Sequence, residues 1–330
     1  MSTDAKKPES KNATAFPGIE LPVSSYAAET RLPEIQFRHH PRECPTVTPV
    51  VVVVLDRPQA KNAFTPDMAR SLVTAFGLLS RDDRVKCVVL TGGDPENRIF
   101  CAGADLKIGF RAGNSSTQDG PGDFRDNGGI VSLAIYNCRK PVVAALNGSG
   151  VGIGITMALG ADIRVASNAP SAKYGFVFAR RGIVMEACSS YFLPRLAGAS
   201  AAVYLTTTGA ALPASHKMLS PLFAEIVPPE EVLPVSLKLA SEIAATTSTV
   251  STRLMKDLVI RSADSPEEAH LLESALLYER FASADMREGV ASFKEKRPPQ
   301  FPGSLERDQL PAWPWWDTKV LARADERSKL

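Results

Sequence analysis

Two glycine-containing segments place backbone N–H groups where they can bind an anion. In residues 147–154 (NGSGVGIG), glycine recurs at every second position. This spacing lacks both the dinucleotide-binding pattern G-x-G-x-x-G and the Gly-Lys-Ser/Thr that ends a phosphate-binding loop. The nucleophile elbow G-x-S-x-G is excluded as well, because Asn147 stands at its first glycine position. What remains is a strand that turns through glycines into a helix, whose first N–H groups and positive dipole end can hold an oxyanion.

Residues 100–106 (FCAGADL) form a second turn of this kind, and a helix is expected to follow it. Taken alone, either segment is more simply explained as a tight turn that allows close packing. Either turn could nevertheless hold an oxyanion through the unpaired N–H groups at its end.

The cysteines and histidines of the sequence show no pattern typical of a disulfide framework or a metal site. The five cysteines form no C-x-x-C pair and their number is odd, which favours a reducing compartment over a disulfide framework. The four histidines show neither H-x-x-H nor H-E-x-x-H spacing. We therefore expect no metal site.

Composition excludes several other classes of protein. The chain of 330 residues has 38 basic and 36 acidic residues, a net charge of +2 that argues against nucleic acid or anionic lipid as partners. Hydrophobic residues make up 44%, as in globular proteins. The longest apolar stretch, residues 141–161, is interrupted by Asn147 and five glycines, so we expect no membrane span. Lys6 and Lys7 lead into polar residues and not into a hydrophobic run, so we expect no secretory signal.

The elements that must position these turns alternate between strands and helices. Residues 50–55 are a β-branched run typical of a strand covered on both faces, and a helix begins near Thr65 with Pro66 in its first turn. Strands are predicted at 87–90, 141–146 and 162–166, which indicates an α/β fold with parallel pairing. From residue 186 helical patterns dominate. The expected organisation is a disordered arm (1–30), a core (31–228), a helical region (229–300) and a tail (301–330).

The chain resembles the crotonase, or enoyl-CoA hydratase/isomerase, superfamily. The resemblance rests on residues 100–106, on residues 140–148 (KPVVAALNG), and on the shorter motifs at 56–58 and 161–164, all in the family's order. It covers roughly residues 45–300. It implies a spiral of ββα units, a helical C-terminal region that forms trimers, often paired into hexamers, and a coenzyme A thioester as substrate. No cofactor is implied, since coenzyme A is part of the substrate.

The resemblance also assigns roles to individual residues. It places the two oxyanion-hole N–H donors at Ala104 and Ile153, where they would stabilise an enolate as its charge develops. The segment that runs along the bound coenzyme comprises Ala102, Gly103, Ala104, Asp105 and Leu106. Ala60 and Lys61 fall where the family holds the adenine end.

The acid/base group distinguishes the activities within this family. The two glutamates of its hydratases fall on Thr156 and Phe178, neither of which can act as a general base near neutral pH. Residues 180–195 are instead similar to the peroxisomal 3-enoyl-CoA to 2-enoyl-CoA isomerases, whose single catalytic glutamate matches Glu186. The alternative for Glu186 is a residue at a helix start that caps neighbouring N–H groups. Burial would raise its pKa and a helix start would lower it.

Three functions are therefore weighed. We expect an enoyl-CoA isomerase; the alternatives are an enoyl-CoA hydratase with relocated acid/base groups and an acyl-CoA-binding protein without turnover. The chain ends in Ser328, Lys329 and Leu330, the tripeptide that the peroxisomal import receptor recognises. This end predicts peroxisomal localisation.

Overall fold

The computed structural model of the chain describes residues 16, 19–108, 124–308, 310–311 and 313–316. The C-terminal tripeptide, Ser328 to Leu330, lies outside the described residues, and so do residues 1–15. The protein is built on a large sheet, a small sheet and ten α-helices within the described residues.

The large sheet has six strands in the order β1-β2-β3-β5-β7-β10. Only the edge strand β1 runs antiparallel to its neighbour, and the remaining pairs are parallel, as the alternation of strands and helices predicts. The strands are β1 (Ile35–His40), β2 (Val50–Leu55), β3 (Cys87–Gly92), β5 (Val142–Leu146), β7 (Ile163–Ser167) and β10 (Glu225–Val227).

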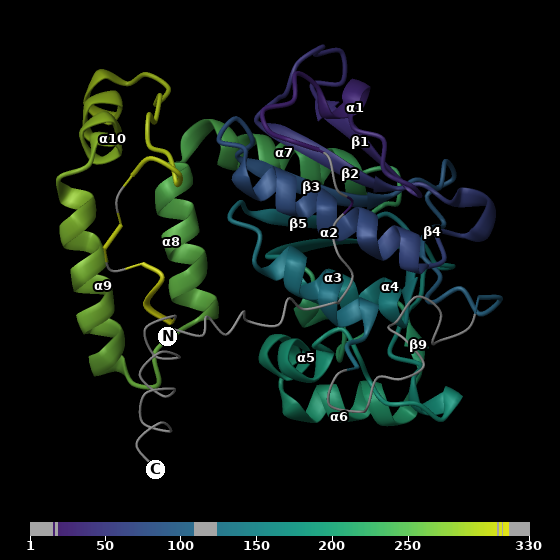
Figure 1. The fold of residues 1–330 in the computed structure, drawn as a ribbon. Helices are drawn as coiled ribbons and strands as arrows, with labels where there is room; N and C mark the ends of the chain where they lie inside the picture. Colours follow the sequence, from purple (N-terminus) through teal and green to yellow (C-terminus); the bar gives the residue numbers. More distant parts are fainter. Residues whose placement is uncertain (1–15, 17–18, 109–123, 309, 312, 317–330) are drawn as a thin grey trace, which may run out of the picture.

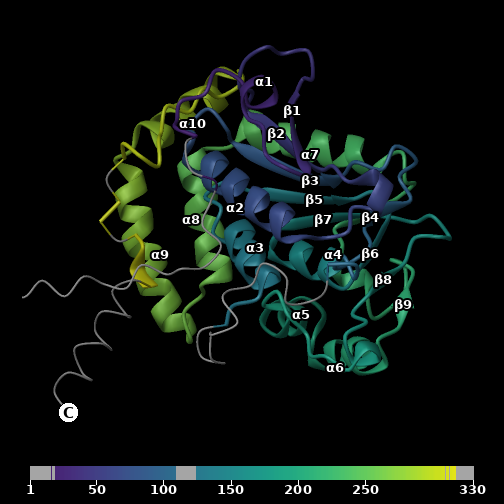
Figure 2. The ribbon, with the colours of Figure 1, turned by 45° about the vertical axis from the view of Figure 1, so that its right-hand side comes forward.

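Helices cover both faces of this sheet, so its strands are apolar on both sides. Val51 and Val53 of β2 belong to the core beneath α2 (Pro66–Arg81) and α3 (Asn127–Tyr136), whereas Val50 and Val52 pack against α7 (Val232–Thr246). Figures 1 and 2 show α2 and α3 on one side of the strands and α7 on the other. The run of β-branched residues at 50–55 is fully buried, as predicted.

The small sheet has the order β4-β6-β8-β9 and is built from strands that alternate along the chain with those of the large sheet. β3 is followed by β4 (Ile99–Cys101), β5 by β6 (Ser149–Val151), and β7 by β8 (Tyr174–Gly175). A helix follows each of these pairs: α3, α4 (Ile153–Thr156) and α5 (Ser189–Ala197). These repeated ββα turns confirm the predicted α/β spiral.

Short elements complete the core. They are α1 (Tyr26–Glu29), η1 (Pro58–Ala60), η2 (Met157–Gly160), η3 (Ala179–Arg181), α6 (Ala199–Thr208), β9 (Ala211–Leu212) and η4 (Ser220–Leu222).

Three C-terminal helices form a separate extension beside the core. α8 (Thr249–Ile260), α9 (Pro266–Phe281) and α10 (Ala284–Glu295) extend away from the sheets on the left of Figure 1. α8 and α9 share a small apolar cluster that includes Leu254 and Leu276, against which Trp313 and Trp315 pack. Trp313 also donates a hydrogen bond of 2.8 Å from its indole nitrogen to the buried Asp257.

The predicted disordered arm does not reach residue 30. Tyr26 is fully buried in α1, and its ring centroid lies 5.3 Å from that of Phe37, with the two rings tilted by 38°. Its hydroxyl donates a hydrogen bond of 3.0 Å to Asp82. An aromatic ring that finds both an apolar partner and a hydrogen-bond acceptor joins the core, which the mixed composition of residues 19–30 conceals. For these residues the prediction is wrong.

In the part of the chain that the structure describes, every helix is too short or too polar to span a lipid bilayer.

Candidate functional site

Two adjacent strands of the small sheet deliver the backbone groups of the candidate site. β4 and β6 pair in parallel, with Ile99 opposite Ser149 and Cys101 opposite Gly150. Neighbouring parallel strands end at the same edge of a sheet. The segments that leave these strands, at residues 102–106 and 152–156, therefore start side by side, and they contain Ala104 and Ile153.

A glycine with positive φ precedes each of these two residues. Gly103 has φ of 105° and Gly152 has φ of 56° with ψ of −126°, conformations that residues with a side chain rarely adopt. The carbonyl of Gly103 accepts a hydrogen bond of 2.8 Å from Phe64, and the N–H of Gly152 donates one of 2.9 Å to Gly175. Within the described residues, the N–H groups of Ala104 and Ile153 donate no hydrogen bond. Within the described residues, the structure thus holds two free donors at Ala104 and Ile153, the positions that the resemblance assigns to the oxyanion hole.

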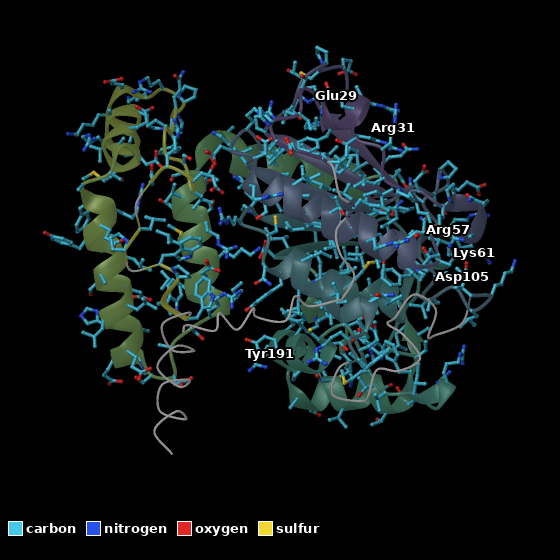
Figure 3. All side chains as sticks on the ribbon, viewed as in Figure 1. Glu29, Arg31, Arg57, Lys61, Asp105 and Tyr191 are labelled. Atoms are coloured by element: carbon cyan, nitrogen blue, oxygen red, sulfur yellow. The ribbon has the colours of Figure 1, made fainter. Side chains whose placement is uncertain are left out.

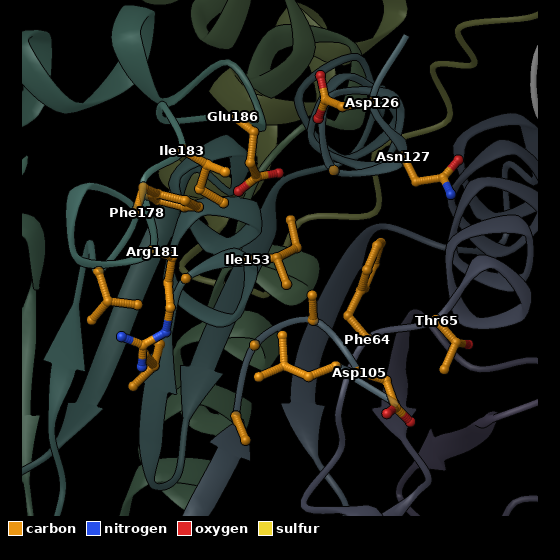
Figure 4. Close-up of a pocket in the computed structure, with 18 of the residues that line it drawn as sticks. Phe64, Thr65, Asp105, Asp126, Asn127, Ile153, Phe178, Arg181, Ile183 and Glu186 are labelled. Atoms are coloured by element: carbon orange, nitrogen blue, oxygen red, sulfur yellow. The ribbon is translucent and has the colours of Figure 1, made fainter. Parts of the chain in front are cut away.

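Both donors border a cavity of about 220 Å³. Its wall is largely apolar and includes Phe64, Ile108, Val151, Val177, Phe178 and Ile183. Figure 4 shows Glu186 and Asp126 at one end of this pocket, Asp105 and Arg181 toward the other, and Ile153 between them. A carboxyl group and two backbone donors therefore face the same small space.

Glu186 is held in an unusual electrostatic environment. Its Oε1 accepts a hydrogen bond of 2.5 Å from the hydroxyl of Thr156, which is fully buried. Burial of the carboxyl group, with a smaller contribution from the neighbouring Asp126 and against the opposing effect of Thr156, raises its pKa to about 8. Near neutral pH both the acid and the carboxylate form of Glu186 are accessible, as proton transfer in both directions requires.

The helix-capping alternative for Glu186 is wrong. α5 begins at Ser189, so Glu186 precedes the helix, and its backbone carbonyl accepts hydrogen bonds from the N–H and hydroxyl of Ser189 at 2.9 and 2.5 Å. The side chain turns away to Thr156. Of the two opposing influences that the sequence left open, burial therefore prevails over the helix dipole.

Asp126 is the site residue that sequence reasoning missed. It caps the N-terminus of α3, which begins at Asn127. Its carboxylate accepts hydrogen bonds from the N–H of Gly129 and, at 3.3 Å, from that of Ala187. An aspartate followed by Asn127, two glycines and an apolar run is a capping signal that would have located the start of this helix, although not the contact of Asp126 with Ala187.

The predicted coenzyme-binding segment borders the cavity along its length. Ala102, Gly103, Ala104, Asp105 and Leu106 all line it, although residues 106–108 form a turn and not the expected start of a helix. Asp105 is fixed by Arg57, whose Nη2 lies 3.1 Å from its Oδ2. Hydrogen bonds from Lys107 and Arg57 lower the pKa of Asp105.

Ala60 and Lys61 lie outside the cavity wall but next to this segment. The Lys61 carbonyl accepts a hydrogen bond of 3.1 Å from the N–H of Ala102, and its side chain is exposed. Figure 3 shows Lys61 near Arg57 and Asp105 at one edge of the molecule. The structure therefore brings all the predicted site residues that it describes to one region.

No cluster of three or more His, Cys, Asp or Glu side chains suited to a metal ion occurs among the residues that the structure places.

Comparison with known proteins agrees with this geometry. The sequence profile of the enoyl-CoA hydratase/isomerase family matches residues 46–304. Enoyl-CoA hydratase ACTT3 of Alternaria alternata is 48% identical over 262 residues, 79% of this chain and 86% of that protein. The 1,2-epoxyphenylacetyl-CoA isomerase of Escherichia coli (strain K12) is 34% identical over 264 residues, 77% of this chain and 95% of that protein. An enoyl-CoA hydratase structure from Bacillus anthracis superposes with a TM-score of 0.71 at 26% identity, covering 82% of this chain and all of that one.

The raised pKa of Glu186 predicts that its replacement stabilises the protein at high pH. In the wild type the folded state retains a proton that the unfolded state releases between the ordinary pKa of 4.5 and about 8, so stability falls as pH rises through this window. Glu186→Gln has no such loss and should be more stable by roughly a few kcal/mol at pH 8, with the difference vanishing below pH 4.5. Thermal unfolding of both proteins from pH 4.5 to 8.5 measures this difference. A stability difference that is independent of pH would contradict the pKa assignment.

Proposed function

Because the chain belongs to the enoyl-CoA hydratase/isomerase family, we propose that it moves a carbon–carbon double bond in an acyl-CoA thioester. The observation that carries the proposal is the placement of Glu186, a buried carboxyl with a pKa of about 8, in the same pocket as the free N–H groups of Ala104 and Ile153. These are the two components of a proton shift next to a carbonyl: a base, and a binding site for the negative charge that it creates.

The reaction begins with a 3-enoyl thioester whose carbonyl oxygen accepts hydrogen bonds from Ala104 and Ile153. The Glu186 carboxylate removes a proton from C2, and the electrons of the C2–H bond delocalise into a dienolate whose oxygen carries the charge. The two donors stabilise this charge in a pocket whose wall is largely apolar. Glu186 then returns the same proton to C4. The double bond has moved from C3=C4 to C2=C3, and no proton is gained or lost overall.

Burial of the carboxyl group suits both halves of this reaction. A carboxylate with an ordinary pKa is too weak a base to remove the α-proton efficiently, and a group with a much higher pKa would remain protonated. A pKa near 8 keeps a useful fraction of Glu186 ionised at neutral pH and makes the protonated form able to donate. The apolar wall formed by Phe178 and Ile183 maintains this environment.

A second candidate is hydration of a 2-enoyl-CoA. The relative from Alternaria alternata is named a hydratase, and the pocket contains a second carboxyl group, Asp126, beside Glu186. Paired carboxyl groups can position and deprotonate a water molecule. A member of the family that binds acyl-CoA without turnover is the third possibility, and the following experiment separates the three.

We expect the purified protein to convert a 3-enoyl-CoA into its conjugated 2-enoyl isomer, and Glu186→Gln to lower this rate by about 10²- to 10⁴-fold because it removes the only carboxyl proposed as the base. Ultraviolet absorbance of the conjugated thioester follows the reaction. Glu267→Gln, an exposed residue in the first turn of α9, is the matched control and should retain the wild-type rate.

The other outcomes favour the alternatives. If a 2-enoyl-CoA loses absorbance while the 3-enoyl-CoA remains unchanged, the protein is a hydratase. If neither thioester reacts but both bind, the binding-protein interpretation is supported. Wild-type isomerisation by Glu186→Gln would remove the assignment of the base.

Peroxisomal localisation is a further proposal, supported by Ser328, Lys329 and Leu330 at the C-terminus. We expect a fluorescent protein fused to the N-terminus of the chain to enter peroxisomes, because the tripeptide then remains terminal and available to the import receptor. Deleting the three residues should leave the fusion in the cytosol, as seen by microscopy beside a peroxisomal marker. Import of the truncated fusion would show that the tripeptide is not required.

Assembly into a homotrimer, or a hexamer of two trimers, is supported by an apolar face on the helical extension. Met255 and Val259 on α8 are 62% and 77% exposed and line, with Tyr191 of α5, a second cavity of about 770 Å³ between the extension and the core. Large apolar side chains gathered on one open face mark an association surface.

Val259→Asp is therefore expected to convert the oligomer into smaller species, because it places a charge in the proposed interface. Sedimentation velocity measures the change, and Glu267→Gln again serves as control. A wild-type chain that sediments as a monomer at micromolar concentration would exclude this proposal.

A further inference from the structure

Asp126 connects the start of α3 to the loop that carries Glu186. As N-cap of the helix, its Oδ1 accepts a hydrogen bond from the N–H of Gly129, and the same oxygen accepts a second from the N–H of Ala187. The second bond joins segments that are 61 residues apart and ends at the residue that directly follows Glu186. Capping α3 does not require this second hydrogen bond to Ala187.

The loop that Asp126 binds has a strained backbone. Ala187 and Cys188 have φ values of 56° and 55°, so two consecutive residues with side chains adopt the left-handed conformation. Such conformations persist only where the surroundings fix them, and they concentrate at functional sites. Asp126 on one side and Ser189, which donates two hydrogen bonds to the Glu186 carbonyl, on the other are the contacts that fix this loop.

The loop sets the position of the Glu186 carboxyl group closely. Its Oε1 lies against Thr156, while its Oε2 lies so near the first turn of α3 that a Cβ atom on Gly128 would approach it to 1.7 Å. The glycine therefore provides the room that the carboxyl occupies. Glu186 is confined between α4 and the N-terminus of α3, with Asp126 as the residue that ties its loop to α3.

We propose that Asp126 is a positioning residue for Glu186: it holds the loop so that the Glu186 carboxyl faces the Ala104 and Ile153 donors. A second consequence of its position is that its charge favours the protonated form of Glu186. The inference rests on the proposed function only in taking Glu186 as the base. Asp126 itself need not touch the substrate.

The groups around Glu186 are consistent with this role. Asp126 of α3 raises the pKa of Glu186, second to burial itself. The facing thiols are Cys101 of β4 and Cys188 of the loop, and burial raises the pKa of both, to about 12 for Cys101, so they are neutral in the pH range considered. Thr156 of α4 contributes an uncharged hydroxyl, and Arg181 and Asp105 lie toward the other end of the pocket. Asp126 is thus the charged neighbour that acts on Glu186 within the described residues.

Two substitutions separate the effect of Asp126 on the position of Glu186 from its effect on the pKa of Glu186. Asp126→Ala removes the acceptor for the Ala187 N–H, and we expect kcat for the double-bond shift to fall about 10²-fold with KM little changed, as for a displaced catalytic group. Asp126→Asn keeps an acceptor oxygen and a good helix cap. It should restore most of kcat but move the acid limb of the pH profile, near pH 8 in the wild type, to lower pH by about one unit.

Ser265→Ala is the matched control for lost helix capping. Ser265 caps α9 through the N–H of Glu268, far from the pocket lining, so this variant should lose some stability and keep the wild-type kcat. An Asp126→Ala variant with wild-type kcat, or an Asp126→Asn variant with the wild-type pH profile, would overturn the proposal.

A measurement without substrate keeps this test independent of the proposed function. The melting temperature of the wild type should fall between pH 5 and 8 because Glu186 retains its proton in the folded state. Asp126→Asn should make this fall smaller, and should have no such effect when Glu186→Gln is also present. If this coupling occurs but no enoyl-CoA is isomerised, the positioning role holds and the proposed function fails. If the coupling is absent, the positioning role is wrong.

Discussion

The parallel pairing of β4 with β6 is the constraint on which the site depends. Parallel neighbours end at one edge, so the turns that follow them are adjacent although about 50 residues separate them in the sequence. In each turn a glycine with positive φ directly precedes the residue with the free N–H group, and that residue lines the cavity. An anion site made from backbone groups needs no charged side chain, and its geometry is as rigid as the sheet. The remaining elements cover that edge of the small sheet with apolar side chains. They also place the Glu186 carboxyl group opposite the two N–H groups.

Placing that carboxyl group is costly for the fold. Glu186 is kept from water, which favours its neutral form, and the two residues after it adopt left-handed conformations that each cost roughly 1–3 kcal/mol. Both costs occur within three residues of each other and beside the donors Ala104 and Ile153. A sequence optimised for stability alone would have a smaller polar residue in place of Glu186 and an unstrained loop after it. The coincidence of an unfavourably buried acid with a strained backbone is therefore an argument from energetics that Glu186 is retained for chemistry.

Much of the fold follows from local patterns in the sequence, whereas the site follows only in part. The β-branched run at 50–55 and the cap at Thr65 are found where periodicity and capping predict them, because burial on both faces and helix starts leave local signals. Ala104 and Ile153 were identified from a resemblance, since nothing local shows which N–H groups remain free. Asp126 and the environment of Glu186 depend on contacts across 30 to 61 residues, and Tyr26 on one across 56. A short stretch of sequence cannot reveal contacts between residues that lie so far apart along the chain.

The wall of the pocket bears on the choice between a proton shift and the addition of water. Adding water requires that a water molecule be held and deprotonated on the far side of the double bond, which needs polar groups at two places. Phe178, buried in the cavity wall, stands at one of the positions where the resemblance puts a hydratase glutamate, and Thr156 at the other is bonded to Glu186 and to the Gly152 carbonyl. An aromatic ring disfavours water where the hydratase needs it, whereas a proton shift benefits from its exclusion. Asp126 adds a second carboxyl, but its contacts with Gly129 and Ala187 commit it to holding the loop. On these grounds the pocket supports the proposed isomerisation, in which Glu186 would carry the proton in both directions.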